Sequence, residues 1–187
     1  MNIFYLDSDA KTSAQMHCDN HCSKMIIEYA QLMSTAHRLL DGEMYMDKTT
    51  NGRSIMRWRL DGKWARNREP DLYKATHVNH PSAIWARQSA KNYMWLYEMW
   101  KELNTEYMYR YSKDAPHASF AKLDKHLRQI PRGMTDGEFT EPTQSMPDDV
   151  KNDSSKIAYR DYYIKYKQHL AQWKLRGMPS WYVTEYA

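Results

Sequence analysis

One stretch of the chain repeats apolar residues at helical spacing, and it constrains the fold more than any other feature. Between Asn20 and Leu40 the apolar positions fall three or four residues apart, at Met25, Tyr29, Leu32, Met33, Ala36 and Leu40. Asp19 or Asn20 offers a capping oxygen at the start, and Asp41-Gly42 ends the run. A helix with one apolar stripe buries that stripe against other elements, so the stretch predicts a helical domain.

Four further stretches predict helices. A short one follows the capping oxygens of Asp7 to Asp9 and runs toward Cys18; the others span 81–113, 119–129 and a C-terminal stretch from Asp153 or Ser154 to Gly177. Residues 131–150 hold three of the seven prolines and predict a surface loop. Residues 178–187 form an aromatic tail. We expect residues 1–187 to form a single domain, which suits this length.

The segment 43–70 has a different character. Asn51-Gly52 and Asp61-Gly62 are dipeptides that favour hairpin turns, so we expect a basic hairpin insertion of two or three strands at about 44–65. From Lys48 to Arg68 the chain carries seven basic residues and one acid, a net +6 in a chain whose total is +4. The predicted fold class is therefore mainly α, a single-domain helical bundle with a small, strongly basic β-hairpin.

The apolar residues are unusual in kind. The chain has 7 Trp, 15 Tyr and 3 Phe, against 23 Ile, Leu and Val, with 13 Met besides. Aromatic side chains bury large areas, so the core is expected to be aromatic and rich in methionine. By position, Trp85, Trp95 and Trp100 belong to this core, whereas Trp58 and Trp64 lie in the basic hairpin.

The sequence also bears on location. It has no run of 18 apolar residues, and its opening carries acids where a signal peptide needs basic and then apolar residues. A disulfide between Cys18 and Cys22, on successive turns of a helix, would constrain almost nothing, which favours a reducing compartment. We expect a soluble, cytoplasmic protein without a membrane partner.

A polar stripe borders the apolar face of the 20–40 helix and marks a candidate groove. At roughly 100° per residue, the stripe gathers His21, Lys24, Glu28, Gln31 and Thr35. Lys24 precedes Glu28 by four residues, and this order stabilises a helix less than the reverse order does. The arrangement therefore favours a role for the pair other than stabilising the helix. The alternative is an ordinary salt bridge on a half-buried face.

The same stripe carries a resemblance to a known family. Cys18 to Glu28, CDNHCSKMIIE, resembles the segment of pyrimidine-dimer DNA glycosylases of the endonuclease V type in which a basic residue precedes a helix glutamate by seven positions. Tyr73, His80-Pro81 and Trp85, and the tail sequence PSWY, are also similar to features of that family. A closer likeness is to a divergent group of uncharacterised phage proteins that share MNIFYLD and NHP…W.

The resemblance implies an activity and its site. In that family the N-terminal α-amine attacks C1′ of a damaged nucleotide and a helix glutamate acts as acid and base, without a cofactor. Carried over, it implies that Met1 is the nucleophile, that Glu28 is the acid/base, and that His21 and His80 line a groove for DNA in the bacterial host cytoplasm. An α-amine, with a pKa of about 7.7–8.0, is more readily neutral than a lysine. Lys24 is an alternative amine if burial lowers its pKa.

Two alternatives belong to other classes. Asn2 after Met1, and Ile27 and Gln31 where the family has arginines, favour a non-catalytic nucleic-acid-binding protein on the same scaffold. The cluster His17, Cys18, His21 and Cys22 suggests a zinc site, and a metal-dependent hydrolase would use His17, Cys22 and His80. We expect no metal there, because the residues of that cluster fall at a predicted helix boundary and no second cluster has paired spacing.

The basic hairpin is the second candidate surface. Alternation along a strand puts Arg57 and Arg59 on one face and Trp58 on the other. The expected contacts to nucleic acid come from cations and stacking aromatics, namely Arg53, Arg57, Arg59, Lys63, Trp64 and, in the tail, Trp181 with Tyr182 and Tyr186. Arg110, Lys122, Lys125, Arg128 and Arg132 would extend this basic surface. The alternative is a solvated hairpin whose tryptophans cover the core.

Overall fold

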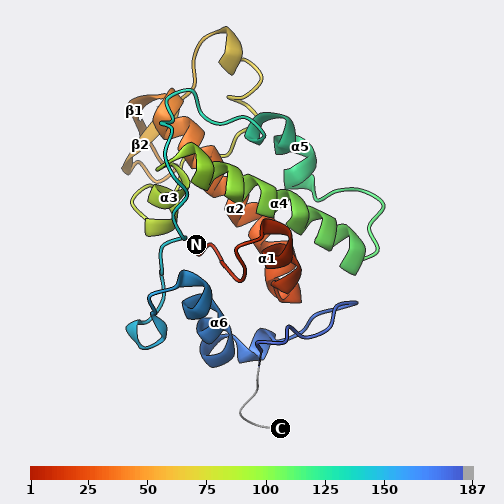
Figure 1. The fold of residues 1–187 in the computed structure, drawn as a ribbon. Helices are drawn as coiled ribbons and strands as arrows, with labels where there is room; N and C mark the ends of the chain where they lie inside the picture. The colour runs from red at the N-terminus through yellow and green to blue at the C-terminus, as the bar shows by residue number, and fades with distance from the viewer. Residues whose placement is uncertain (183–187) are drawn as a thin grey trace.

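The computed structural model describes residues 1–182 and is mainly helical with one small β-hairpin, as predicted (Figure 1). Its α-helices are α1 (Ala10–Met16), α2 (Asp19–Asp41), α3 (Pro81–Ala86), α4 (Ala90–Arg110), α5 (Ala118–Leu127) and α6 (Ser155–Tyr166). The strands are β1 (Glu43–Lys48) and β2 (Ser54–Arg59). Short 3-10 helices lie at Lys63–Ala65, Asp148–Val150 and Gln168–Leu170. Val183 to Ala187, including Tyr186 of the tail, lie outside the described residues.

The two long helices form the centre of the fold. α2 packs against α4, α1 covers α4, and α3 and α5 pack against α2. The first six residues run as an extended segment between α2 and α6, since the ring of Phe4 stacks on His21 and contacts Tyr159 and Tyr163 edge-on. The start of the chain is thereby packed into the interior (Figure 1).

The core is aromatic, as the composition predicts. Its largest fully buried side chains include Trp85, Trp100, Tyr29, Tyr93 and Tyr159. Buried aromatic hydroxyl and indole groups need partners, and they have them: Tyr159 donates to the carbonyl of Thr143, and Trp100 donates to that of Ile26. Trp95 differs from the prediction, because it is only half-buried and its indole nitrogen donates to the carbonyl of Ser8.

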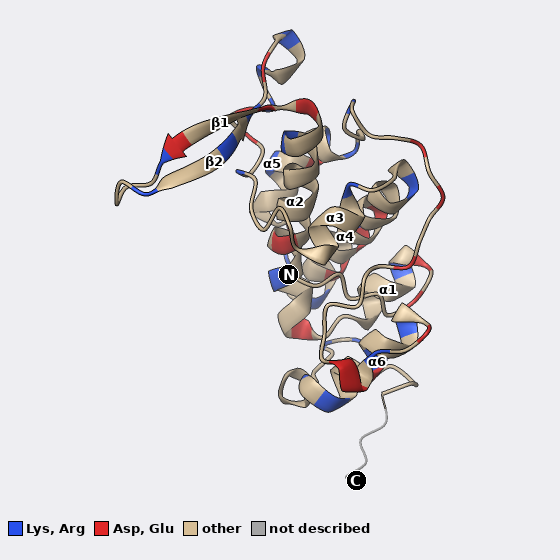
Figure 2. Cartoon of the chain, turned by 90° about the vertical axis from the view of Figure 1, so that its left-hand side faces the viewer, with Lys and Arg blue, Asp and Glu red and all other residues tan. Residues whose placement is uncertain are grey.

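The hairpin projects from the helical body (Figure 2). Its antiparallel register pairs Tyr45 with Arg57 and Glu43 with Arg59, so both arginines lie on one face, as predicted, with Trp58 on the other. Gly52 has a φ of +75° in the turn, a value that glycine adopts without strain. The insertion ends earlier than predicted, because the chain after Asp61-Gly62 forms a 3-10 helix and no third strand.

Three predicted helix boundaries are wrong. The N-cap of α2 is Cys18, because the Asp19 carboxylate instead accepts from Arg110 and from the backbone of Lys174. The predicted 81–113 helix is two helices, since Ser89 caps a new one by accepting from the amide of Asn92. The C-terminal helix stops at Tyr166, because the chain after it turns back to bond the start of α2, where Asp19 donates its amide to the carbonyl of Gln172.

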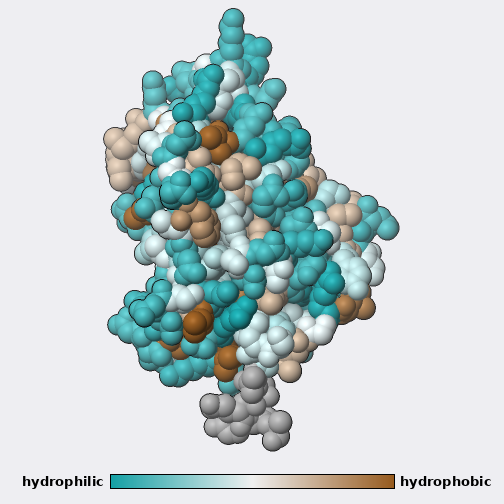
Figure 3. Space-filling model, in the orientation of Figure 1, coloured by the Kyte–Doolittle hydropathy of each residue, from teal (hydrophilic) through white to brown (hydrophobic). Residues whose placement is uncertain are grey.

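The surface is mostly hydrophilic in the view of Figure 3, where apolar side chains appear singly and in small groups. Within residues 1–182, no helix combines the length and the apolar character that a membrane span requires. Arg110 is absent from the basic surface predicted for it, because its side chain is fully buried between α1, α2 and α4.

Candidate active site

The polar stripe of α2 opens onto a cavity of about 280 Å³ that we call the N-terminal pocket. Met1, Lys24 and Glu28, the three residues expected to supply amine and acid/base chemistry, all line it. Figure 2 shows the N-terminus beside α2, on the side from which the hairpin projects. The full lining is Met1, Asn2, Phe4, His21, Lys24, Met25, Glu28, Ser145, Tyr162 and Lys167.

The N-terminal segment is fixed at the pocket by hydrogen bonds to three helices. Ser82 on α3 donates its hydroxyl to the carbonyl of Met1 at 3.1 Å. Three residues on, the amide of Phe4 donates to the hydroxyl of Tyr29 on α2, and the carbonyl of Phe4 accepts from Ser13 on α1. The apolar opening sequence thus holds the first residue against α2, where the resemblance requires the amine to be.

Glu28 and Lys24 form the charged edge of the pocket. Lys24 Nζ lies 3.4 Å from Glu28 Oε1, and the two side chains are 61% and 20% exposed. An exposed ion pair of this kind contributes little to stability. The Lys24 side chain therefore lacks the burial on which its role as an alternative amine depends.

His80 caps α3 next to the same pocket. Its Nδ1 accepts from the amide of Ser82 at 3.2 Å, so a neutral ring carries its proton on Nε2. Burial, then the α-amine of Met1 and then His77, lower the pKa of His80, and Glu28 opposes them. The amine, the carboxylate and the imidazole are therefore electrostatic neighbours.

His21 forms part of the pocket wall and is only 4% exposed. Its ring stacks on Phe4 with centroids 4.2 Å apart, and its Nδ1 lies 2.6 Å from the hydroxyl of Tyr163. Burial, followed by His17 and nearby lysines, lowers the pKa of His21 to about 3. The buried, neutral ring supports the N-terminal segment and offers little surface to a nucleic acid.

Two buried histidines predict acid sensitivity. Burial also lowers the pKa of His17 to about 4, so both rings stay neutral in the folded chain, whereas in the unfolded chain they bind protons below about pH 6.5. Stability therefore falls as the pH drops below 6.5, by about 2 kcal/mol per histidine at pH 5. Urea unfolding at pH 7 and pH 5 measures this loss. His21→Gln should reduce the loss, and the exposed-site control His77→Gln should leave it unchanged; equal losses in the two variants would contradict the prediction.

The clustered cysteine and histidine side chains that were candidates for a metal site are buried and serve in packing and hydrogen bonding. His17 bonds the carbonyl of Ser13 and the hydroxyl of Tyr29. Cys18 and Cys22 are buried free thiols, and burial raises the pKa of Cys22 to about 12. Within residues 1–182, no three His, Cys, Asp or Glu side chains lie close enough together to hold a metal ion.

The hairpin residues lie away from the N-terminal pocket, and none lines it. Arg53 and Lys63 are exposed, Arg57 Nε lies 3.6 Å from Asp47 Oδ2, and the guanidinium of Arg59 lies 6.0 Å from the centroid of Tyr45. In the tail, Trp181 is half-buried, contacts Tyr163 and donates to Met16 Sδ. The hairpin segment therefore presents Arg53, Arg59 and Lys63 to solvent, whereas the side chain of Arg57 is only 21% exposed and the described part of the tail packs against the body.

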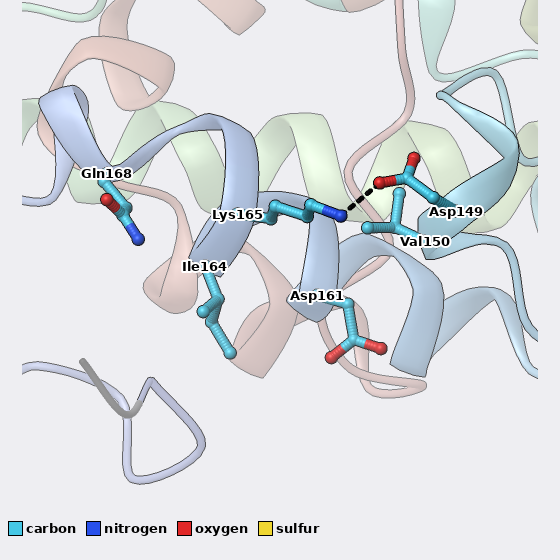
Figure 4. A pocket seen from close by; sticks show the side chains of 6 residues that line it. All are labelled: Asp149, Val150, Asp161, Ile164, Lys165 and Gln168. Atoms are coloured by element: carbon cyan, nitrogen blue, oxygen red, sulfur yellow. Dashed lines mark hydrogen bonds and ion pairs between the residues drawn. The ribbon is translucent and has the colours of Figure 1, made fainter. Parts of the chain in front are cut away.

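A larger cavity lies elsewhere, between α6 and the Asp148–Val150 turn, and has a volume of about 420 Å³ (Figure 4). Its lining is Asp149, Val150, Asp161, Ile164, Lys165 and Gln168, and an ion pair joins Lys165 to Asp149 across it. The cavity has no histidine or thiol in its lining, and its one amine, that of Lys165, is paired with Asp149. We therefore place the candidate chemistry in the smaller N-terminal pocket.

Several pocket residues were missed by sequence reasoning. Ser145, Tyr162 and Lys167 come from the loop before α6 and from α6 itself, more than a hundred residues after Glu28. No local pattern links them to the α2 stripe; Tyr162 belongs to a crowded tyrosine series that also suits plain packing. Comparisons of the chain with protein-family models, with curated proteins and with solved structures found no match.

Proposed function

We propose that the N-terminal pocket is an amine active site that acts at C1′ of a DNA nucleotide, in the manner of an N-glycosylase and AP lyase. The α-amine of Met1 is the nucleophile and Glu28 is the general acid and base. The observation that carries the proposal is that Met1, held by Ser82, and Glu28 line one cavity. Proximity of nucleophile and acid/base is what such a reaction requires.

The chemistry needs no cofactor. The neutral nitrogen of Met1 forms a bond to C1′ while the N-glycosyl bond breaks, and the leaving base takes a proton from Glu28. The nitrogen then returns a proton to the Glu28 carboxylate. Opening of the sugar ring forms the C1′=N double bond, and the ring oxygen takes up a proton. Because a base in a duplex is stacked, the nucleotide must first be flipped out of the helix.

Borohydride trapping tests the proposal directly. DNA with an abasic site presents an aldehyde at C1′, which condenses with an amine to an imine that borohydride reduces to a stable amine. We expect a covalent adduct that maps to Met1 and disappears when the N-terminus is blocked. The mass of the intact N-terminus provides the control, because the mechanism requires a free Met1 amine. An adduct on Lys24 alone would assign the chemistry to the other amine.

A non-catalytic binding protein remains the second candidate, and one observation favours it. Ile27, next to Glu28, is an apolar residue that is 39% exposed, and Gln31 follows one turn later on α2. Neither side chain can hold a phosphate in the way an arginine does. Salt-dependent DNA binding without any trapped adduct, on abasic or ultraviolet-damaged DNA, would support this candidate and overturn the first.

The basic hairpin is proposed to hold the DNA backbone under either function. Reversing both Arg57 and Arg59 to glutamate should weaken DNA affinity at least tenfold at low salt and lower the slope of log affinity against log salt by about two, since two phosphate contacts are lost. Fluorescence anisotropy at several salt concentrations measures both. A matched reversal of Lys11 and Lys113, exposed residues on α1 and just after α4, changes the net charge equally and should have a much smaller effect. Equal losses of DNA affinity in the two double variants would show that DNA binding depends on net charge alone and not on the hairpin.

A further inference from the structure

A second polar cavity lies at the other end of α2. It has a volume of about 160 Å³ and is lined by His37, Asp41, Trp64, Arg68, Gln129, Ile130 and Arg132; we call it the arginine pocket. Asp41 follows Glu28 by thirteen residues on the same helix, which places them about 20 Å apart at 1.5 Å per residue. The arginine pocket is therefore separate from the N-terminal pocket.

Two guanidinium groups meet at this pocket. Those of Arg68 and Arg132 lie 5.2 Å and 4.9 Å from the ring of Trp64. Among residues 1–182, neither arginine forms an ion pair with a carboxylate, although Arg68 also bonds the carbonyl of Trp64 and the side chain of Gln129. The Nε of Arg68 is buried without a partner. Two cations that line one pocket, one of them with an unused buried donor, suit an anion.

The opposite wall holds a carboxylate oxygen without a donor. Asp41 has a side chain that is 2% exposed; its Oδ1 accepts from the amide of Gly133 at 2.8 Å, whereas its Oδ2 has no hydrogen-bond partner and lies 3.5 Å from His37 Nδ1. His37 Nε2 lies 3.0 Å from the hydroxyl of Tyr93, which donates its own proton to the carbonyl of Leu127. Nε2 therefore carries the ring proton, and Nδ1 of a neutral ring is an acceptor.

The charge state of the histidine supports this arrangement. Burial lowers the pKa of His37, with Arg68 acting in the same direction and Asp41 opposing, so the ring is neutral at pH 7. The wall thus presents two acceptors and needs a donor.

We propose that the arginine pocket binds an oxyanion that carries one proton, and that hydrogen phosphate is its simplest ligand. The unprotonated oxygens accept from Arg68 and Arg132, and the P–OH group donates to Asp41 Oδ2. A water molecule occupies about 30 Å³, so the cavity holds an anion of five non-hydrogen atoms. Sulfate has the same shape but no proton at pH 7, so its oxygen would face the carboxylate oxygen and be repelled.

Titration calorimetry with inorganic phosphate and sulfate at equal ionic strength tests the proposal. The full chain should bind phosphate at least tenfold more tightly than sulfate, the range expected when a buried acceptor lacks its donor. Asp41→Asn keeps the oxygen that Gly133 needs, and its amide can donate to either anion, so it should remove the preference. Arg132→Gln should weaken phosphate binding, whereas Arg66→Gln, at an exposed arginine nearby in the chain, should not.

The source of the phosphate is a separate arm of the experiment. Two oligonucleotides of the same sequence, one with a 5′-phosphate and one without it, are each tested as competitors of inorganic phosphate for the arginine pocket. Competition by the phosphorylated oligonucleotide alone would identify a phosphomonoester end as the ligand. Competition by neither would identify free phosphate. Equal binding of phosphate and sulfate by the unmodified chain, or unchanged binding in Arg132→Gln, would overturn the proposal. None of these variants alters Met1 or Glu28, so adduct trapping is a separate result.

Discussion

Replacing Glu28 by glutamine is expected to slow strand cleavage at an abasic site by about 10²–10⁴-fold while leaving the borohydride adduct in place. Glutamine has the shape of glutamate but cannot transfer a proton. Condensation of the Met1 amine with the abasic aldehyde needs no departing base, so it survives the substitution. Later proton abstraction from the sugar depends on the carboxylate. Single-turnover cleavage and adduct yield are measured on the same substrate.

The control for Glu28 is Glu102→Gln, which removes a carboxylate from the middle of α4 and not from the pocket. Its cleavage rate should equal that of the unmodified chain. Because the Lys24–Glu28 pair is largely exposed on the lysine side, Glu28→Gln should change the stability of the fold little. If the cleavage rate of Glu28→Gln lay within threefold of the rate of the unmodified chain, the carboxylate would have no part in the mechanism.

Replacing Arg110 by methionine is expected to destabilise the fold by about 3–5 kcal/mol. Its buried guanidinium pairs with Glu106 at 3.0 Å and Asp19 at 3.1 Å, and it donates to the carbonyls of Gln15 and His17. Methionine fills the space but leaves two carboxylates and two carbonyls short of donors. Arg176 continues to pair with Glu106, so most of the lost stability should come from the Asp19 carboxylate, which loses its ion pair. The midpoint and slope of urea unfolding at pH 7 give the free energy of unfolding.

Lys101→Met on the same helix is the matched control. Lys101 pairs with Glu98, and both side chains are more than a third exposed, so its loss should cost less than about 1 kcal/mol. If Arg110→Met also cost less than 1 kcal/mol, the buried network would not hold α1, α2 and α4 together.

The elements predicted best were those whose signal is local. The α2 stripe repeats every three or four residues, and Asn51-Gly52 marks a tight turn between β1 and β2. The break before α4 was missed because Ser89 is an unremarkable residue until its hydroxyl accepts from Asn92 and its side chain donates to the carbonyl of Glu138. The early end of α6 was missed because it depends on the hydrogen bond from the amide of Asp19 to the carbonyl of Gln172, two residues that are far apart in the sequence.

The candidate site was predictable in part for the same reason. Lys24 and Glu28 share a helix face, so spacing alone placed them together, whereas Met1 was expected at the site only from the family resemblance. Tyr162 and Lys167 reach the pocket only through the packing of α6 on the first residues. Arg110 carries the same charge as the hairpin arginines, and nothing in its neighbours along the chain distinguishes a buried cation from a solvated one.

The sequence by itself determined which segments are helical, where the hairpin turns, that the core is aromatic, and where the positive charge is concentrated. These properties depend on residues within one or two turns of each other. Only the tertiary structure decided that Met1 and Glu28 line one pocket, that His21 and Arg110 are buried, and that Arg68, Arg132 and Asp41 line another pocket. Burial and charge pairing between distant segments arise from packing, which no local periodicity encodes.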